Sequence, residues 1–367
     1  MKPTNRSADI FWGANPAKGA RRSQPSSSAS LSLAERLFAT GDDRRAYRAV
    51  EGGIERLEKN LVTETAFHDG MAEVSARYLL DAGGKRVRPL LAFLTAQLGD
   101  GVTDDVITAA TSIELIHLAS LYHDDVMDEA EQRRGVPTAH TVWSNSIAIL
   151  TGDLLFARAS KLLSILGEQA IRLQADTFER LCLGQLHETV GPRPGEDAIA
   201  HYLQVLADKT GSLIAASAQL GVLVSNAPVE YQQPVFDFGE KIGIAFQLVD
   251  DVIDLAPQSD GTGKTAGTDI RAGVVTLPLL YLQRDAPTDP SAADLLRRLD
   301  PAVIDVTPPA EIDVLIARLR AHPVTAETIV ESRRWAADAV AALDPLPEGT
   351  IKKTLVRFAA TMVDRSS

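Results

Sequence analysis

Two aspartate-rich motifs are the residues of this sequence best suited to chemistry. DDVMD begins at Asp124 and DDVID begins at Asp250. On a helix, the first and last aspartates of such a motif lie one turn apart on the same face, with the second aspartate beside them. Like charges at this spacing destabilise a helix unless a cation compensates them.

The neighbours of both motifs are apolar, and buried carboxylates are costly unless they are paired or bind a metal. A solvated helix face explains one such motif, but two copies in apolar helices favour metal binding. Two carboxylates that leave positions open for water and phosphate oxygens suit magnesium bound to a polyphosphate. The predicted metal ligands are Asp124, Asp125, Asp128, Asp250, Asp251 and Asp254.

Basic residues that match a polyanionic substrate lie close to these motifs. In GGKRVRP, which begins at Gly83, two glycines permit close backbone approach and the arginines can form forked bonds to phosphate. Arg133 and Arg134 follow the first aspartate motif directly. Further candidates are Lys85, Arg88, Lys209, Thr210 and Lys264.

Two features near these residues have competing explanations. GTGKTAGT, which contains Lys264, lacks the spacing of a P-loop, and no strand precedes it. His117 lies seven residues before Asp124, on the same helix face. It is either a buried histidine of the core or a phosphate contact.

Bulk properties narrow the function classes. The formal net charge of −12 disfavours nucleic-acid binding, although metal ions would still allow an anionic substrate. Cys182 is the single cysteine, so the chain has no intramolecular disulfide and fits a reducing, cytoplasmic location. No apolar run reaches the roughly 18 residues of a transmembrane helix.

The elements that must position these residues are helices. From Leu33 onward, apolar residues recur at steps of three and four, most clearly over 105–130, 147–166, 171–189, 198–224 and 235–255. We therefore expect one all-α domain over 33–367, a large bundle around a central cavity. Residues 1–32 are basic and serine-rich, which predicts a disordered tail, with an organellar transit peptide as the alternative.

Five motifs in this order resemble the trans-isoprenyl diphosphate synthase family: GGKRVRP, HLASLYHDDVMDEAEQRRG, LADKTGSL, AFQLVDDVID and GKTAGTDI. The resemblance covers about residues 45–285, and bacterial long-chain polyprenyl diphosphate synthases are the most similar. It implies an isoprenoid-synthase fold, several Mg²⁺ ions per active site and a homodimer. It also implies head-to-tail condensation of isopentenyl diphosphate with an allylic diphosphate, and peripheral membrane contact when the product leaves.

The resemblance also implies roles for individual residues. Isopentenyl diphosphate would be bound by Lys85, Arg88, His117 and Arg134. The allylic diphosphate would be bound by Arg133, Lys209, Thr210, Gln247 and Lys264. The catalytic residues would be Asp124, Asp125, Asp128, Arg133, Lys209 and Asp250. Val274 stands where the family often has a lysine, and Arg271 is the candidate to replace it.

Product length is predicted from two small residues, Ala119 and Ser120, which precede Asp124 by five and four positions. They lie roughly 7 Å along the helix from the metal site, where a bulky aromatic residue commonly closes the pocket of short-chain relatives. We therefore expect a long all-trans product of the quinone side-chain type. A short-chain farnesyl or geranylgeranyl diphosphate synthase and a subunit of a two-component synthase remain alternatives. The repeated DDVxD disfavours a terpene cyclase.

Overall fold

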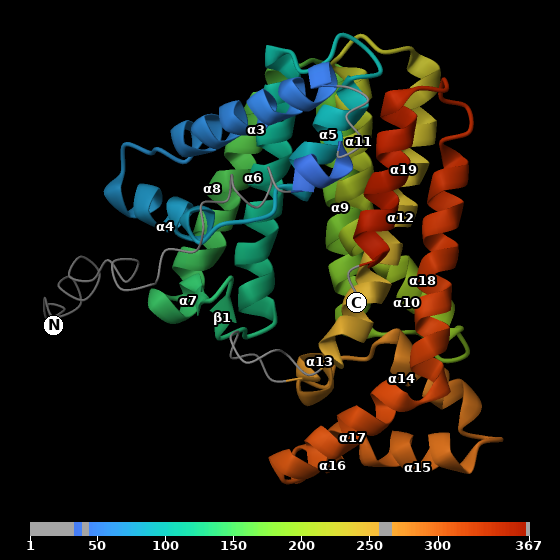
Figure 1. Cartoon of the computed structure of the whole chain (residues 1–367). Helices are drawn as coiled ribbons and strands as arrows, with labels where there is room; N and C mark the ends of the chain where they lie inside the picture. The colour runs from blue at the N-terminus through green and yellow to red at the C-terminus, as the bar shows by residue number, and fades with distance from the viewer. Residues whose placement is uncertain (1–32, 39–43, 257–265, 365–367) are drawn as a thin grey trace, which may run out of the picture. The chain divides into compact units, whose positions relative to one another are not determined.

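The computed structural model describes residues 33–38, 44–256 and 266–364, which are almost entirely helical (Figure 1). This confirms the predicted all-α class. The chain divides into two compact units. Unit 1 comprises Met1–Ala175 and Ser217–Gln232, and unit 2 comprises Asp176–Ala216 and Gln233–Ser367. The predicted tail (residues 1–32) and Lys264 lie outside the described residues.

Unit 1 is built around one buried helix, α6 (Asp104–Met127). Thr103 caps its first turn by accepting a hydrogen bond from the Val106 amide, and buried residues occur on every side of it, as in a helix at the centre of a core. Helices α8 (Asn145–Ile165), α5 (Val87–Ala96) and α3 (Arg44–Glu64) pack against α6. The unit also contains α4 (Gly70–Asp81), α7 (Ala139–Val142) and the short strands β1 (Gln132–Arg133) and β2 (Val136–Pro137).

Unit 2 is organised around α12 (Gln232–Asp254). This helix lies very close to α11 (Ser212–Leu223), because a Cβ atom at Gly239 would lie 2.6 Å from the Ala215 Cα. The apolar core of the unit joins α12 to α14 (Leu277–Asp285), α15 (Pro290–Arg298) and α17 (Pro309–Ala321).

The structure also describes helices between and after these elements. They are α9 (Glu168–Val190), α10 (Ala198–Leu206), the π-helix η2 (Ala207–Gly211), the 3₁₀ turn η3 (Val229–Tyr231), α13 (Thr268–Arg271), α16 (Pro301–Ile304), α18 (Pro323–Ala342) and α19 (Thr350–Val363). None of the helices in the described ranges has the length and apolar character needed to span a bilayer.

Candidate functional site

The first aspartate motif lies at the carboxyl end of α6. The helix ends at Met127, and Asp128 follows as its C-cap. Carboxylates are unfavourable there, because the helix dipole already places partial negative charge at this end. The second motif lies at the carboxyl end of α12, which ends at Asp254. The same electrostatic demand for a cation therefore arises independently in each unit.

Asp125 is the buried member of the first motif, with 1% of its surface exposed. Its Oδ1 accepts a hydrogen bond from Arg133 Nε at 2.7 Å. Its Oδ2 is buried and, within the part of the chain that the structure describes, has no hydrogen-bond partner. Burial raises the pKa of Asp125, and Arg133 opposes that rise. An acceptor oxygen left over in this way fits a cation, which would supply the missing partner.

The described residues contain no cluster of three His, Cys, Asp or Glu side chains able to hold a metal ion by themselves.

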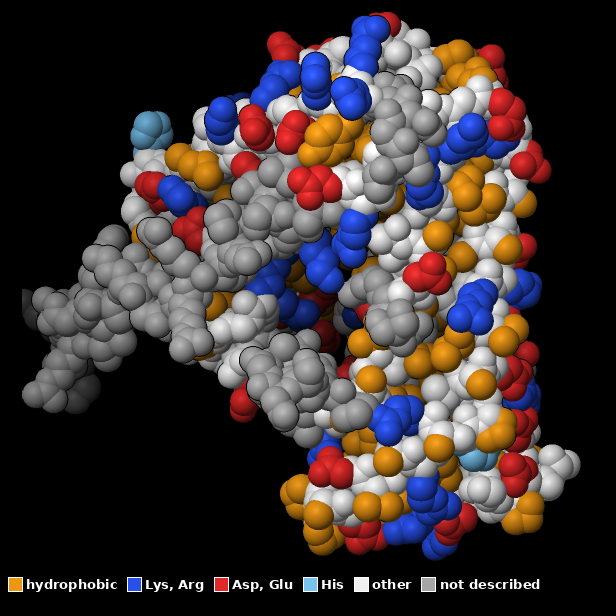
Figure 2. Space-filling view, viewed as in Figure 1, with side chains coloured by type: hydrophobic (Ala, Val, Ile, Leu, Met, Phe, Trp, Pro, Cys, Tyr) orange, Lys and Arg blue, Asp and Glu red, His pale blue; other side chains and the backbone are white. Residues whose placement is uncertain are grey.

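Positive charge is concentrated around His117. Burial and four arginines lower the pKa of His117 well below its usual value, so the ring is neutral at pH 7. The four guanidinium groups belong to Arg88, Arg134, Arg86 and Arg133. Figure 2 shows Lys and Arg side chains beside acidic ones over the part of unit 1 that carries α6 and β1. A buried cluster of arginines is suited to an anion that makes forked contacts.

Arg88 has a donor available for such an anion. Its Nε is buried and makes no hydrogen bond to any described residue. Burial lowers the pKa of Arg88, and the charge of Glu114 partly offsets this effect. Arg88, His117 and Arg134, three of the four residues predicted to bind isopentenyl diphosphate, thus lie together in unit 1, while Lys85 is exposed in the same loop.

The hairpin formed by β1 and β2 explains how Arg133 and Arg134 are positioned. Arg134 (φ 53°) and Gly135 (φ 77°) form the two-residue turn between the paired residues Arg133 and Val136. Positive φ at both turn positions matches the type I′ geometry that tight hairpins favour. Arg133 consequently reaches Asp125, whereas Arg134 Nη1 donates to the carbonyl oxygens of Leu79, at 2.8 Å, and Gly83. Burial lowers the pKa of Arg134 to about 10.

Arg86, the other arginine of GGKRVRP, was not among the predicted substrate contacts, and its guanidinium is held by two carboxylates. Its side chain is fully buried, with Nε 2.8 Å from Glu58 Oε1 and Nη1 2.7 Å from Glu114 Oε1. Arg86 therefore anchors the loop to α3 and α6. No sequence pattern pointed to Glu58 and Glu114, because only the fold brings them to Arg86.

In unit 2, the three aspartates of the second motif have different surroundings. Asp250 is partly exposed. Asp251 is buried, and its Oδ2 accepts hydrogen bonds from the Tyr202 hydroxyl at 2.6 Å and the Leu277 amide at 3.3 Å. Burial raises the pKa of Asp251 to about 8, although these two hydrogen bonds act to lower it. Asp254 accepts from the amides at the start of α13, those of residues 268 and 269, at 3.2 and 3.1 Å.

Lys209 and Thr210 lie in the π-helix η2, a distortion that is frequent at functional sites. Thr210 Oγ1 donates to Gln247 Oε1 at 3.4 Å, so two predicted contacts of the allylic diphosphate meet in unit 2. Lys209 forms an ion pair with Glu188 of α9. Gln185, also on α9, has a buried Oε1 without a partner among the described residues. Sequence reasoning missed both α9 residues, although their spacing of three places them on one helix face.

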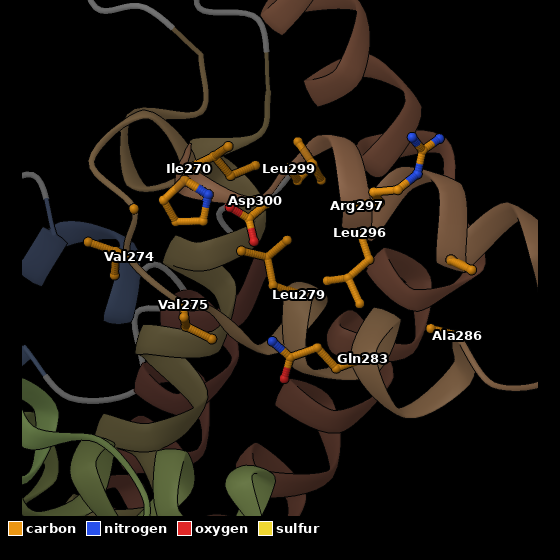
Figure 3. A pocket seen from close by; sticks show the side chains of 13 residues that line it. Ile270, Val274, Val275, Leu279, Gln283, Ala286, Leu296, Arg297, Leu299 and Asp300 are labelled. Atoms are coloured by element: carbon orange, nitrogen blue, oxygen red, sulfur yellow. The ribbon is translucent and has the colours of Figure 1, made fainter. Parts of the chain in front are cut away.

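Arg271 and Val274 follow the second motif. Arg271 Nη2 lies 2.5 Å from Asp313 Oδ1, and its Nε donates to the Ala266 carbonyl oxygen at 3.1 Å. Val274 instead lines a cavity of about 420 Å³ in unit 2, together with Ile270 and Leu279 (Figure 3). The substitution of Arg271 for the family lysine therefore stays a prediction.

The two residues predicted to govern product length, Ala119 and Ser120, are both buried in α6. Ser120 Oγ donates to the His117 carbonyl oxygen at 2.9 Å, which satisfies its hydroxyl within the helix. Small side chains therefore lie between His117 and the aspartate motif at the carboxyl end of α6.

Comparison with known proteins gives consistent results. The family model described as Polyprenyl synthetase matches residues 70–303. A nonaprenyl diphosphate synthase from Mycobacterium tuberculosis is 41% identical over 92% of this chain and 97% of its own.

Among the solved structures similar to this chain are two that were described as complexes with calcium and isoprenyl diphosphate. A polyprenyl synthase from Caulobacter crescentus has a TM-score of 0.79 at 28% identity, over 91% of this chain and 98% of its own. A geranylgeranyl pyrophosphate synthase from Corynebacterium glutamicum has a TM-score of 0.77 at 37% identity, over 88% and 98%.

Proposed function

The chain belongs to the polyprenyl synthetase family, and we propose that it extends an allylic diphosphate with isopentenyl diphosphate to make a long all-trans polyprenyl diphosphate. It is a prenyltransferase of isoprenoid biosynthesis. The observation that carries the proposal is the arginine cluster around His117, which lies beside a buried aspartate with an unused oxygen. That combination suits a diphosphate and a divalent cation together.

Each group of residues has a distinct task in this proposal. Isopentenyl diphosphate is bound by Lys85, Arg88, His117 and Arg134. The allylic diphosphate is bound by Arg133, Lys209, Thr210, Gln247 and Lys264. Neutral His117 donates one hydrogen bond without adding charge, whereas the arginines balance the negative charge of the phosphates.

The proposed metal is Mg²⁺. Of the six aspartates predicted as its ligands, the proposal retains Asp124, Asp125, Asp128, Asp250 and Asp254, and it leaves out Asp251, whose Oδ2 accepts hydrogen bonds from Tyr202 and Leu277. When bound, it would neutralise the charge that develops on the departing diphosphate. The surrounding basic side chains are positioned in advance to stabilise the same developing charge. Arg133 and Lys209 stabilise the diphosphate as the allylic carbon–oxygen bond breaks. The double bond of isopentenyl diphosphate then attacks the allylic cation, and the proton released is taken up by the leaving diphosphate.

We also propose a homodimer, a cytoplasmic location and a peripheral membrane contact that receives the apolar product. Exposed apolar side chains on α8, at Ile149, Leu150 and Leu154, support an interface between two copies. The single cysteine supports a reducing compartment.

A short-chain product is the alternative, and the likeness to a geranylgeranyl pyrophosphate synthase favours it. Incubation of the purified chain alone with labelled isopentenyl diphosphate, several allylic primers and Mg²⁺ separates the two, because chromatography sizes the products. We expect chains longer than geranylgeranyl. A product that stops at geranylgeranyl supports the alternative, and inactivity without a second protein would mean that the chain is one component of a synthase.

The role of the first aspartate motif is tested in the same assay. Asp124→Ala should lower turnover about a thousandfold or more, since metal-based charge stabilisation is worth several kcal/mol. The thermal unfolding midpoint should stay close to that of the unsubstituted chain. Asp105→Ala, at the exposed amino end of the same helix, is the matched control and should keep its turnover. Near-normal activity of Asp124→Ala would contradict the mechanism.

A further inference from the structure

Tyr202 and Asp251 form a partly buried hydrogen bond in unit 2 that joins α10 to α12. The Tyr202 hydroxyl lies 2.6 Å from Asp251 Oδ2, and the Leu277 amide at the start of α14 donates to the same oxygen at 3.3 Å. Asp251 is only 3% exposed. Three helices therefore meet at one carboxylate oxygen, whose two lone pairs are both used.

This geometry separates Asp251 from the other aspartates of its motif. Neighbouring residues on a helix point about 100° apart, while residues four apart share a face. When α12 turns Asp251 into the core, it turns Asp250 and Asp254 together to a different side. Asp250 and Asp254 are both partly exposed, whereas Asp251 is buried, as this geometry requires.

Building on the proposed function, we propose that Asp251 is a positioning residue rather than a magnesium ligand, and that Tyr202 is its partner. The sequence had grouped Asp251 with the ligands. In the structure, its carboxylate is held between α10 and α14 and fixes the carboxyl end of α12. Asp250, the next residue in the chain, and Asp254, one turn later, are then held where a metal bound to diphosphate requires them.

If Asp251 orients the metal ligands Asp250 and Asp254, loss of its hydrogen bond should change metal affinity and activity. Groups that orient metal ligands through hydrogen bonds typically change metal affinity or activity by about 10- to 100-fold when they are lost. A hydrogen bond that only stabilised the fold would change the unfolding temperature and leave the dependence on Mg²⁺ unaltered. The Mg²⁺ concentration for half-maximal effect therefore distinguishes the two roles.

The test compares Tyr202→Phe, Asp251→Asn, Asp251→Ala and Asp250→Asn. For each, we would measure kcat, both KM values and the Mg²⁺ dependence of turnover. The Mg²⁺-dependent rise in unfolding temperature with inorganic diphosphate gives a readout that needs no turnover. Tyr281→Phe is the matched control, because Tyr281 is another tyrosine of unit 2, is buried, and packs against Arg284.

Tyr202→Phe should lower kcat about 10- to 100-fold and raise the Mg²⁺ requirement. Asp251→Asn keeps an acceptor oxygen for Tyr202 and Leu277, so it should recover most of the kcat that Asp251→Ala loses. The double variant Tyr202→Phe/Asp251→Ala should be no worse than Asp251→Ala, since both changes remove one contact. Asp250→Asn, which removes a proposed ligand, should be the most damaging.

Two results would overturn the inference. One is an Asp251→Asn variant as impaired as Asp250→Asn, with the same shift in Mg²⁺ dependence, because that result makes Asp251 a ligand. The other is a Tyr202→Phe variant equal to the unsubstituted chain in both kcat and Mg²⁺ dependence. If Tyr202→Phe does not fold, the two Asp251 variants still decide. If the proposed function is wrong, the unsubstituted chain will be inactive with every primer. The thermal shift with Mg²⁺ and inorganic diphosphate would still test the role of Asp251 in that case.

Discussion

The charge state of His117 illustrates how a single side chain of unit 1 suits the binding of an anion. A protonated imidazole next to four arginines would add repulsion to an already costly concentration of positive charge, so the fold keeps the ring neutral. A neutral ring can still donate one hydrogen bond to phosphate. The arrangement gives stability to the protein only while His117 stays unprotonated.

The pH dependence of stability follows from this depressed pKa. In the unfolded chain His117 titrates near 6.5, whereas in the folded protein its pKa lies well below that value. Below pH 6.5 the unfolded state therefore binds more protons, and the free energy of unfolding falls as the pH falls, by at most about 1.4 kcal/mol per pH unit. Denaturant unfolding of the unsubstituted chain and of His117→Gln, measured between pH 7.5 and 5, checks this expectation.

His117→Gln should lose that part of the acid sensitivity. His68→Gln is the control, because His68 is exposed in the same unit. Identical pH profiles for His117→Gln and the unsubstituted chain would contradict the assignment of a neutral buried ring.

Residue types and spacing were enough to propose the aspartate motifs, Arg88 and His117 as site residues, and their roles stay predictions. The anchoring role of Arg86 and the burial of Asp251 could not be foreseen, because the partners Glu58 and Tyr202 lie 28 and 49 residues away. Such pairings depend on how helices pack, and a local pattern does not record that.

At the scale of elements, close helix packing in unit 2 depends on glycine. A Cβ atom at Gly239 of α12 would lie 2.6 Å from the Ala215 Cα, which is backbone that cannot move aside alone. Gly239→Ala should therefore lower the free energy of unfolding by about 1–3 kcal/mol, as overpacked cores do. Thermal or denaturant unfolding measures the change.

Gly52 provides the matched control for that substitution. It lies inside α3, and a Cβ atom there would meet no atom within 4 Å. Gly52→Ala should raise stability by about 0.5–1 kcal/mol, because alanine restricts the unfolded chain and favours helix. Equal effects of the two substitutions would show that packing between α11 and α12 does not decide the outcome.

We expect residues of α6 to determine the length of the product. Ala119 and Ser120 are small, and both lie about one turn before Asp124. Ala119→Phe should therefore shorten the product, measured by chromatography of the dephosphorylated chains. Ala159→Phe, at a fully buried alanine of α8 in the same unit, imposes similar crowding on another helix. Shortening by both variants, or by neither, would count against a specific role of Ala119.

The helices themselves were predictable, but their interruptions were not. The apolar stripe predicted over 105–130 corresponds to α6, which covers Asp104–Met127. The hairpin of β1 and β2 has two residues in each strand, too few for any periodicity to appear. The π-helix η2 likewise differs from its neighbours only by backbone hydrogen bonding, which the sequence LADKTG does not reveal.

At the scale of the whole molecule, α8 presents the strongest evidence for self-association. Leu150 and Leu154 lie one turn apart on its exposed face, with Ile149 beside them, and Leu150 is 60% exposed. Apolar side chains grouped on one face of a helix in this way commonly mark an interface. In a homodimer, two copies of the same patch would bury one another about a twofold axis.

Leu150→Glu should therefore shift the protein from dimer to monomer, because it places a charge in each half of a self-complementary surface. Sedimentation velocity over a range of concentrations measures the change. Val330→Glu is the control: Val330 is 63% exposed on α18, so the same substitution there adds the same charge without touching α8. A chain that remains dimeric after Leu150→Glu would place the interface elsewhere, and one that is monomeric before any substitution would exclude the proposed homodimer.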